Sequence, residues 1–192
     1  GALLINDEQF VARAEIIREK GADRSRFFRG EVDKYTWQDI GSSFLSGELV
    51  AAFLWAQLEE AEQITSERLS IWQNYHRLLE RLEADGLLRR PVIPKECGHN
   101  GHIYYLLLAT KINRQKILEN LKEAGVHAIF HYIPLHSSPA GTRFGRIHGD
   151  LKNTEELSER LVRLPLWIGL SMTDQQRVVH ELERAIEKSL FS

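Results

Sequence analysis

The sequence is poor in cysteine, in clustered positive charge and in long apolar runs, and each shortage excludes a class of protein. Cys97 is the only cysteine, so no internal disulfide can form, a composition typical of a reducing cytoplasm. The 25 Lys and Arg residues are balanced by 27 Asp and Glu residues, giving a net charge of −2, and the basic residues are spread along the chain. This distribution lacks the basic patch of a nucleic-acid-binding protein. We therefore expect a cytoplasmic protein with no nucleic-acid partner.

The longest apolar run is also too short for a membrane span, so we expect no membrane partner. Leu49–Ala56 contains eight residues, whereas a membrane-spanning helix needs about 20. The first residues, Ala2–Ile5 followed by Asn6 and Asp7, are typical of a buried strand entering a turn rather than of a signal peptide. Because a buried strand needs neighbours on both sides, we expect the chain to continue a structure that begins upstream.

At 192 residues and 43% apolar composition, the chain is long enough to bury a core, as one domain or as two small ones. After the first strand, Asn6 or Asp7 is expected to cap a helix that ends at Gly21, since Phe10 and Ile17 keep helical spacing. The chain therefore begins with a strand–helix unit.

Residues 22–41 follow no helical or strand period and form a predicted long loop. Loops of this length in compact domains are functional or disordered, and the aromatic content argues against disorder. The loop contains three arginines, Arg24, Arg26 and Arg29, and four aromatic residues, Phe27, Phe28, Tyr35 and Trp37. The guanidinium groups are suited to binding phosphates, although solvation of an exposed loop is the favoured interpretation of these arginines taken alone.

A long helix is predicted from about Gly47 to Leu82, capped by Ser46. Two apolar stripes with a polar interval between them indicate that its halves pack on different cores. The segment Gly41–Ser46 lies before this helix, so its backbone N–H groups and serine hydroxyls converge where a helix N-terminus favours an anion. A plain capping loop is the alternative.

The remainder of the chain alternates between strand and helix patterns. Ile103–Leu108 is a predicted strand, Asn113 is expected to cap a helix ending before Gly125, and His127–His131 is the next strand, which together make a β-α-β unit. We expect three further elements, a short helix near Glu155–Glu159, a strand over Leu161–Leu166 and a last helix opened by Thr173. The C-terminal half is thus predicted to be a small open-faced α/β domain.

The run Phe130–Pro139 carries the most distinctive side chains. It places His131, Tyr132 and His136 at a strand end that opens into a loop stiffened by proline. Such a loop suits a binding site, although half-buried, satisfied histidines are the alternative. The spacing of the histidines at 127, 131, 136 and 148 lacks any established metal-ligand pattern, so we expect no metal site.

Several motifs occur in a fixed order along the chain: Gly1–Ile5, Arg18–Gly21, Gly41–Ser43, Glu48–Ala52, Gln57–Leu58, His131–His136, Leu164–Leu166 and Leu170–Ser171. This order resembles the DegT/DnrJ/EryC1/StrS family of sugar-nucleotide aminotransferases, which use pyridoxal 5′-phosphate (PLP). The run Lys34–Ser43 is similar to the branch of that family whose product is dTDP-4-amino-4,6-dideoxygalactose, used in enterobacterial common antigen synthesis. The resemblance covers essentially all 192 residues.

The resemblance implies an α/β fold, the C-terminal part of a type I, aspartate aminotransferase-like PLP fold with a long bridging helix and a small α/β domain. Residues 1–60 correspond to the end of the large PLP-binding domain, with the substrate loop and the start of the long helix. Residues 61–90 are the rest of that helix and a linker, and residues 91–192 are the small domain. In the family, the lysine that bonds to PLP lies shortly upstream of a Gly-Glu-Gly-Gly run, of which Gly1 is the last residue. The resemblance thus implies that no catalytic residue lies in this chain, which should be inactive alone.

The resemblance also assigns roles to residues of this chain. It implies PLP as the cofactor, with Ser42 and Ser43 near the phosphate of the partner subunit in a homodimer, where the family has Asn at the position of Ser43. It implies that the substrates are glutamate and a nucleotide sugar, so that an amino group passes to the C4 ketone of a dTDP-4-keto-6-deoxyhexose. The implied substrate-binding residues are Arg26, Arg29, Tyr35, Trp37, His131, Tyr132 and His136. The alternative is a non-catalytic interaction or regulatory module derived from such an enzyme.

Overall fold

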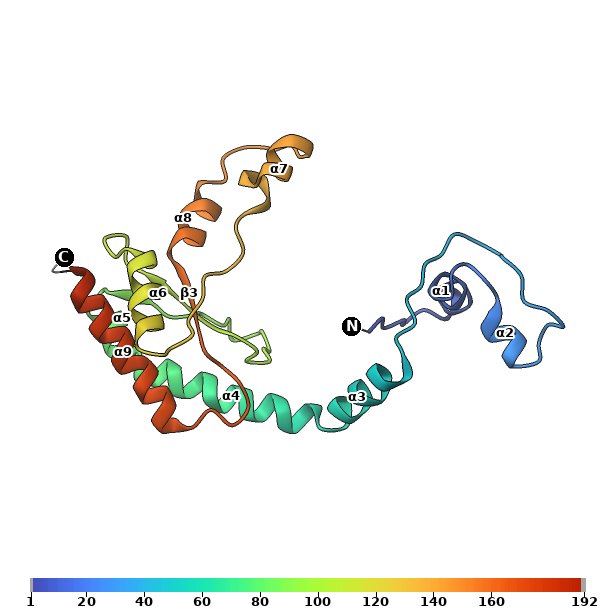
Figure 1. The fold of residues 1–192 in the computed structure, drawn as a ribbon, viewed down its shortest axis with the longest axis horizontal. Coiled ribbons are helices and arrows are strands. Elements are labelled where there is room, and N and C mark those ends of the chain that lie inside the picture. The colour runs from blue at the N-terminus through green and yellow to red at the C-terminus, as the bar shows by residue number, and fades with distance from the viewer. Residues whose placement is uncertain (1, 191–192) are drawn as a thin grey trace. The chain divides into compact units, whose positions relative to one another are not determined.

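The structure, a computed structural model, describes residues 2–190, which divide into two compact units between Glu59 and Glu60. The first unit contains a 3-10 helix and three α-helices (Figure 1): η1 (Glu8–Phe10), α1 (Val11–Arg18), α2 (Arg24–Phe28) and α3 (Glu48–Glu59). The predicted strand Ala2–Ile5 is wrong, because these residues are exposed and pair with no neighbour among those described. Asp7 does act as a cap, since its carboxylate accepts a hydrogen bond from the Gln9 N–H.

Two glycines hold the first unit together where its backbone segments cross. Gly21 has a φ of +80°, and its carbonyl accepts hydrogen bonds from the N–H groups of Gln38 and Asp39 at 2.7 and 3.1 Å. A Cβ at Gly21 would lie 1.7 Å from the Asp39 carbonyl oxygen, and a Cβ at Gly41 would lie 2.1 Å from the Gly21 nitrogen. Only glycine permits this approach, and it brings the end of α1 against the segment that contains Ser42 and Ser43.

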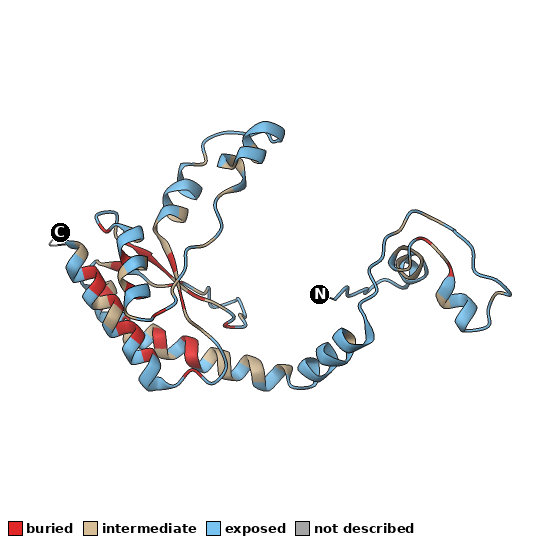
Figure 2. Cartoon of the chain, in the orientation of Figure 1, coloured by how far each residue is buried: buried red, intermediate tan, exposed pale blue. Residues whose placement is uncertain are grey.

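The first unit has almost no core of its own. Most of its large apolar side chains are exposed, and Figure 2 shows most of the unit in the colour of exposed residues, with much of α1 intermediate. Helix α3 is the clearest case, because it is apolar around its circumference and contains no buried residue; Leu49 is 89% exposed. A helix that is apolar on all sides is normally buried in a larger protein.

The predicted helix 47–82 is correct in extent but is interrupted at single residues. It is formed by α3, by α4 (Ala61–Leu78) and by α5 (Glu80–Ala84). Glu60 and Leu79 have ψ angles of 11° and 1°, outside the α-helical range, and they mark the two interruptions. At the start, the Gly47 carbonyl accepts the hydrogen bond from the Ala51 N–H, so Gly47 rather than Ser46 is the N-cap residue of α3.

The second unit is built on a three-stranded antiparallel sheet. Its elements after α5 are β1 (Leu88–Arg89), β2 (Tyr104–Leu108), α6 (Arg114–Glu123), η2 (Leu135–Ser137), α7 (Pro139–Phe144), α8 (Lys152–Arg160), β3 (Leu161–Leu164) and α9 (Met172–Leu190). The strand order is β1-β2-β3, with Leu88 opposite Leu108 and Tyr104 opposite Leu164. In Figure 1, α9 lies along α4 and α6, and the contacts between these helices agree.

One face of the sheet forms the core with these helices. Tyr104 and Leu106 of β2 and Val162 of β3 are fully buried against residues of α4, α6 and α9. Figure 2 shows this buried layer along α9 and the adjoining part of α4. Because strand residues alternate between faces, Tyr105 and Arg163 lie on the opposite face of the sheet. The small α/β unit predicted for the C-terminal half is therefore present.

Local signals were correct at α6, where the Asn113 side chain accepts a hydrogen bond from the Lys116 N–H. The predicted strand His127–His131 is wrong except at one point, an antiparallel bridge between Ile129 and Arg163. The expected β-α-β unit is not formed, because β3 lies beside β2 and pairs with it in the antiparallel sense. The cap of α9 is Ser171 rather than Thr173, since the Ser171 Oγ accepts from the Asp174 N–H at 3.1 Å.

Among residues 2–190, no helix combines the length and the apolar character needed to cross a bilayer.

Candidate functional site

The predicted cofactor residues Ser42 and Ser43 lie in the segment that crosses the end of α1. The Ser42 backbone is fixed on both sides, by its N–H to the Ile17 carbonyl and by its carbonyl to the Lys20 N–H, both at 3.0 Å, and Ser43 forms a bridge with Glu19. Both side chains are exposed, and within residues 2–190 neither hydroxyl has a hydrogen-bond partner. Glu48 occupies the first turn of α3. The free hydroxyls, rather than the helix terminus, are therefore the groups suited to hold a phosphate.

The arginines of the predicted substrate loop are already paired with carboxylates. Arg29 donates to both oxygens of Glu15, at 3.0 and 2.9 Å, and to Glu31 at 2.6 Å. Arg26 donates to the same Glu31 at 3.2 Å. These hydrogen bonds raise the pKa of Arg29, the bonds to Glu15 contributing most. The two guanidinium groups thus lie together around Glu31, and a phosphate that binds Arg29 would have to displace Glu31 or Glu15.

The aromatic residues of the loop form a small exposed cluster. The rings of Phe27 and Tyr35 meet edge to face with centroids 5.6 Å apart, and Phe28 packs on Phe27 in the same manner at 5.7 Å. Trp37 is 79% exposed, and its indole N–H donates to the Asp39 carbonyl at 2.7 Å. The structure brings Tyr35 close to the arginine-bearing helix α2, whereas Trp37 lies in the bridge with Ala22.

Asp23 is a residue that the sequence did not single out. It is 5% exposed, and it accepts hydrogen bonds from the Thr36 N–H at 2.6 Å and from the Gln38 side chain at 3.1 Å. The Asp23 N–H in turn donates to the Thr36 carbonyl at 3.2 Å. Asp23 therefore closes the loop that carries Arg26, Arg29 and Tyr35. Its only signal in the sequence was its position after Gly21, at the start of an irregular segment.

In the second unit, His131 and Tyr132 lie next to the edge of β3. Their rings meet edge to face with centroids 5.2 Å apart, and Tyr132 is 82% exposed. His131 Nδ1 lies 3.5 Å from a terminal nitrogen of Arg163. The backbone just before them is anchored by Ile129, which exchanges both hydrogen bonds with Arg163 at 3.1 and 2.7 Å.

His136 is separated from this pair by the turn at Pro134. It lies in the middle of the short helical segment η2, and its Nε2 lies 3.2 Å from the Glu155 carboxylate of α8. Of the three predicted sugar-binding residues, the structure brings His131 and Tyr132 into contact and directs His136 to Glu155. The six predicted residues of the loop and the serine segment belong to the first unit, and these three belong to the second.

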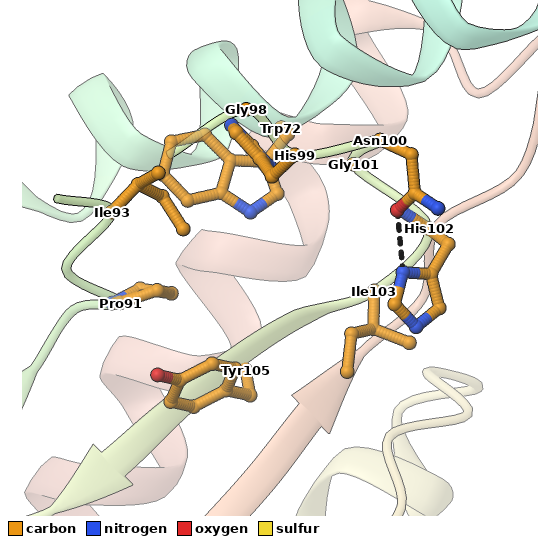
Figure 3. Close-up of a pocket in the computed structure, with 10 residues that line it drawn as sticks. All are labelled: Trp72, Pro91, Ile93, Gly98, His99, Asn100, Gly101, His102, Ile103 and Tyr105. Carbon is orange, nitrogen blue, oxygen red and sulfur yellow. Dashed lines mark hydrogen bonds between the residues drawn. The ribbon is translucent and has the colours of Figure 1, made fainter. Parts of the chain in front are cut away.

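A groove with a volume of ≈ 600 Å³ lies beside β2 in the second unit (Figure 3). Trp72 and His99 form one wall, Pro91 and Ile93 another, and Tyr105 closes the side formed by β2. Asn100 accepts a hydrogen bond at 2.7 Å from His102, which orients that imidazole at the mouth. The groove is therefore mainly apolar and aromatic.

His76 packs behind Trp72, with ring centroids 4.8 Å apart in a stacked arrangement. Burial lowers the pKa of the His76 imidazole, and the nearby Arg90 guanidinium adds to the effect. Tyr104 Oη lies 3.4 Å from His76 Nδ1, which suits a neutral ring that accepts the hydroxyl proton. Across the described part of the chain, no three His, Cys, Asp or Glu side chains are grouped as a metal ion would require.

Comparisons with known proteins find aminotransferases both among proteins of similar sequence and among proteins of similar structure. The chain is 25% identical over 192 residues to the dTDP-4-dehydro-2,3,6-trideoxy-D-glucose 4-aminotransferase of Saccharopolyspora spinosa, covering 97% of this chain and 48% of that protein. It is 26% identical over 191 residues to the UDP-4-amino-4,6-dideoxy-N-acetyl-beta-L-altrosamine transaminase of Helicobacter pylori, covering 97% of this chain and 48% of that protein. The chain thus spans about half the length of the curated relatives it matches.

Among solved structures, the aminotransferase TlmJ from Streptoalloteichus hindustanus matches with a TM-score of 0.79 at 22% identity, over 96% of this chain and 47% of that one. This likeness confirms the predicted fold, the C-terminal part of a type I PLP-dependent aminotransferase. A family model described as the DegT/DnrJ/EryC1/StrS aminotransferase family matches residues 1–183. Because that match runs through both units, with the serine segment, the substrate loop and the His131 segment inside it, this chain belongs to the DegT/DnrJ/EryC1/StrS aminotransferase family.

Proposed function

We propose that this chain is the C-terminal portion of a PLP-dependent aminotransferase, a soluble cytoplasmic homodimer. Its amino donor is glutamate, and its acceptor is the C4 ketone of a dTDP-4-keto-6-deoxyhexose, as in the making of amino sugars for enterobacterial common antigen. The products are 2-oxoglutarate and the 4-amino sugar nucleotide. Family membership over residues 1–183 supports an aminotransferase, and the Saccharopolyspora spinosa relative named for a dTDP-linked substrate supports this acceptor class.

The observation that carries the proposal is the exposed apolar surface of the first unit. Helix α3 has no buried residue, and Phe53, Trp55 and Leu58 are all exposed. Leaving such a surface in water is unfavourable by roughly 25 cal/mol per Å². In this account, the rest of the large PLP-binding domain covers residues 2–59, and the chain spans about half of the relatives because that part lies upstream.

The residues of the first unit fit a phosphate-bearing cofactor. Bound PLP supplies the electron sink that allows an amino group to pass from donor to acceptor. Ser42 and Ser43 would hold its phosphate, because their hydroxyls are exposed and have no partner within residues 2–190. Arg26, Arg29, Tyr35 and Trp37 would bind the nucleotide sugar from the loop that Asp23 closes. The loop would also shield the reacting groups from water.

The second unit would contribute the groups nearest the sugar. Tyr132 is exposed and has a hydroxyl suited to a sugar hydroxyl, and His131 presents an imidazole beside it. His136 would act through its contact with Glu155, which fixes the turn after Pro134. In this account, the lysine that bonds to the cofactor lies in the upstream half of the protein, so this chain alone would be inactive.

The test is a coupled assay of the complete enzyme with purified substrates. We expect transamination from glutamate to dTDP-4-keto-6-deoxyglucose, detected as 2-oxoglutarate together with an amino-sugar nucleotide of the corresponding mass. UDP-linked 4-keto sugars and alanine are the matched alternatives for acceptor and donor. Turnover with UDP-linked acceptors alone would contradict the dTDP assignment, and no turnover with any nucleotide sugar would contradict the proposed reaction.

A further inference from the structure

Arg163 occupies a central position on the face of the sheet opposite the core. In the antiparallel register it lies directly opposite Tyr105 of β2, and on its other side it exchanges both backbone hydrogen bonds with Ile129. Residues directly opposite one another in antiparallel strands project to the same face. The side chains of Tyr105, Arg163 and Ile129 therefore form a row across this face.

This row connects the two features of the second unit that are suited to bind a ligand. Tyr105 closes one side of the groove lined by Trp72 and His99 (Figure 3). At the other end, Ile129 leads after two residues to His131, whose ring contacts Tyr132. Arg163 is thus the cation between the groove and the predicted sugar-binding residues.

The guanidinium of Arg163 has hydrogen-bonding capacity that the described residues do not satisfy. Its Nε is buried and has no hydrogen-bond partner, and within residues 2–190 no carboxylate forms an ion pair with Arg163. Its one polar side-chain contact is to His131 Nδ1, at 3.5 Å. A buried guanidinium N–H without an acceptor is costly, and Arg163 as a residue is only half-buried, so an oxyanion that reaches its terminal nitrogens would be favoured.

The arginines of the substrate loop differ from Arg163 in this respect. Arg29 is held by Glu15 and Glu31, and Arg26 shares Glu31 with it. Both must exchange a protein carboxylate for a ligand oxyanion. Arg163 has no such competitor among the described residues, and its fork of N–H groups matches a carboxylate or a phosphate.

We propose that Arg163 is a substrate-binding residue that holds an oxyanion, either the diphosphate of the nucleotide sugar or a carboxylate of the amino donor. This inference rests on the proposed function and names a cation for it that the sequence did not suggest. In the same contact, Arg163 donates to His131 Nδ1, so that the other ring nitrogen, Nε2, carries the proton toward the sugar. Arg163 thereby binds the oxyanion and also orients the His131 ring.

The experiment measures binding of two probes to the complete PLP-loaded enzyme by calorimetry. Thymidine diphosphate represents the diphosphate, and glutarate represents the donor's carboxylates without its amino group. The variants are Arg163→Gln, which removes the charge, and Arg163→Lys, which keeps it without the fork. Arg184→Gln is the matched control, because Arg184 is an exposed arginine of α9 whose partner is Glu181 at 3.2 Å. Thermal unfolding of each variant checks that the fold persists.

We expect Arg163→Gln to weaken one probe by about tenfold to a hundredfold, the usual effect of losing a charge-assisted hydrogen bond. Arg163→Lys should weaken the same probe by an intermediate factor, and Arg184→Gln should leave both unchanged. Selective loss of thymidine diphosphate assigns the diphosphate, and selective loss of glutarate assigns the carboxylate. If Arg163→Gln does not fold, the selective loss in Arg163→Lys decides alone.

Other outcomes overturn the inference. In one such outcome, Arg163→Gln binds both probes within twofold of wild type, and its kcat is reduced as much as that of His131→Gln. Arg163 would then only position His131. Equal losses for both probes would indicate a general disturbance of the site. Suppose that the wild-type enzyme binds both probes and transaminates, and that the Arg163 variants bind both probes as tightly as wild type. This result overturns the inference about Arg163 and leaves the proposed function standing. A wild-type enzyme that binds neither probe overturns both.

Discussion

Asp23 and Thr36 close the loop that carries three of the predicted substrate-binding residues. Asp23 Oδ1 accepts the Thr36 N–H at 2.6 Å, and the Asp23 N–H donates to the Thr36 carbonyl at 3.2 Å. Asp23 is buried in a unit whose apolar residues are largely exposed. Polar pairing rather than a hydrophobic core therefore fixes the shape of this loop.

Replacing Asp23 should loosen the loop. In the complete enzyme, Asp23→Ala leaves the Thr36 N–H without its acceptor and removes one of the two acceptors of the Gln38 amide, which costs about 1–3 kcal/mol locally. We expect faster amide hydrogen exchange over residues 24–37 and a higher KM for the nucleotide sugar. Asp33→Asn is the control, as Asp33 lies exposed in the same loop. Unchanged exchange in Asp23→Ala would show that other contacts hold the loop.

The free hydroxyl of Ser43 predicts a measurable effect on cofactor retention. Ser43→Ala in the complete enzyme removes a proposed donor to the PLP phosphate and should weaken PLP binding by about tenfold. The affinity is measured from the cofactor absorbance after dialysis. Ser46→Ala is the matched control, because Ser46 is exposed in the same segment. Equal retention by the Ser43→Ala variant and wild type would remove Ser43 from the phosphate site.

Arg29 tests whether the loop binds the nucleotide sugar. Because Glu15 holds the guanidinium through two hydrogen bonds of 3.0 and 2.9 Å, a ligand phosphate must take its place. Arg29→Ala should raise KM for the nucleotide sugar about tenfold and leave KM for glutamate unchanged. Glu15→Gln should lower KM for the nucleotide sugar, since it weakens the competing pair.

Arg13→Ala provides the control for Arg29, since Arg13 is an exposed arginine whose partner is Asp39 at 3.2 Å. Steady-state kinetics with each substrate varied in turn separates the effects. If Arg29→Ala changes both KM values equally, or if Glu15→Gln raises KM for the nucleotide sugar, Arg29 has a structural role and links α1 to the loop.

The environment of His76 predicts that the second unit loses stability at acidic pH. Burial against Trp72 and the charge of Arg90 lower its pKa below the ordinary value of 6.5, so the unfolded chain binds the proton more readily than the folded one. The contribution of neutral His76 to the free energy of unfolding is therefore fully present above pH 6.5, and it is lost as the pH falls through the pKa of the folded state. We expect the His76 ring protons to titrate below pH 6.5 by NMR. His76→Gln should reduce the loss of the urea midpoint between about pH 7 and 5; a loss equal to that of wild type would place the acid sensitivity elsewhere.

Local signals sufficed for some elements of the fold. The Asn113 cap, the apolar strand at 104–108 and the helix before Gly125 depend on neighbouring residues, and each was predicted within one residue or two of its observed bounds. The long helix was predicted in extent, but the interruptions at Glu60 and Leu79 were not, because neither residue is proline or glycine. The strand 127–131 was wrong, since its pattern of alternation is realised by one bridge only, at Ile129.

For the candidate site, sequence reasoning named residues where a family resemblance marked them, and it missed residues whose role depends on partners far away in the sequence. The resemblance supplied Ser42, Ser43 and the His131 segment as expectations. Asp23 and Arg163 gave no comparable signal, because their importance comes from Thr36, Tyr105 and Ile129, which lie 13 or more residues away. The carboxylate partners of Arg29 were invisible for the same reason, since Glu15 is separated from it by a turn and a helix.

The most direct test of the central claim, that these residues are one part of a larger catalyst, is cofactor absorbance and transamination in a mixture of two polypeptides. The 192-residue chain alone should show neither PLP absorbance nor amino transfer, and adding the upstream half of the protein as a separate polypeptide should restore both. A chain that remains a stable monomer and gains no affinity for PLP when the upstream half is present would contradict this account and favour a non-catalytic module.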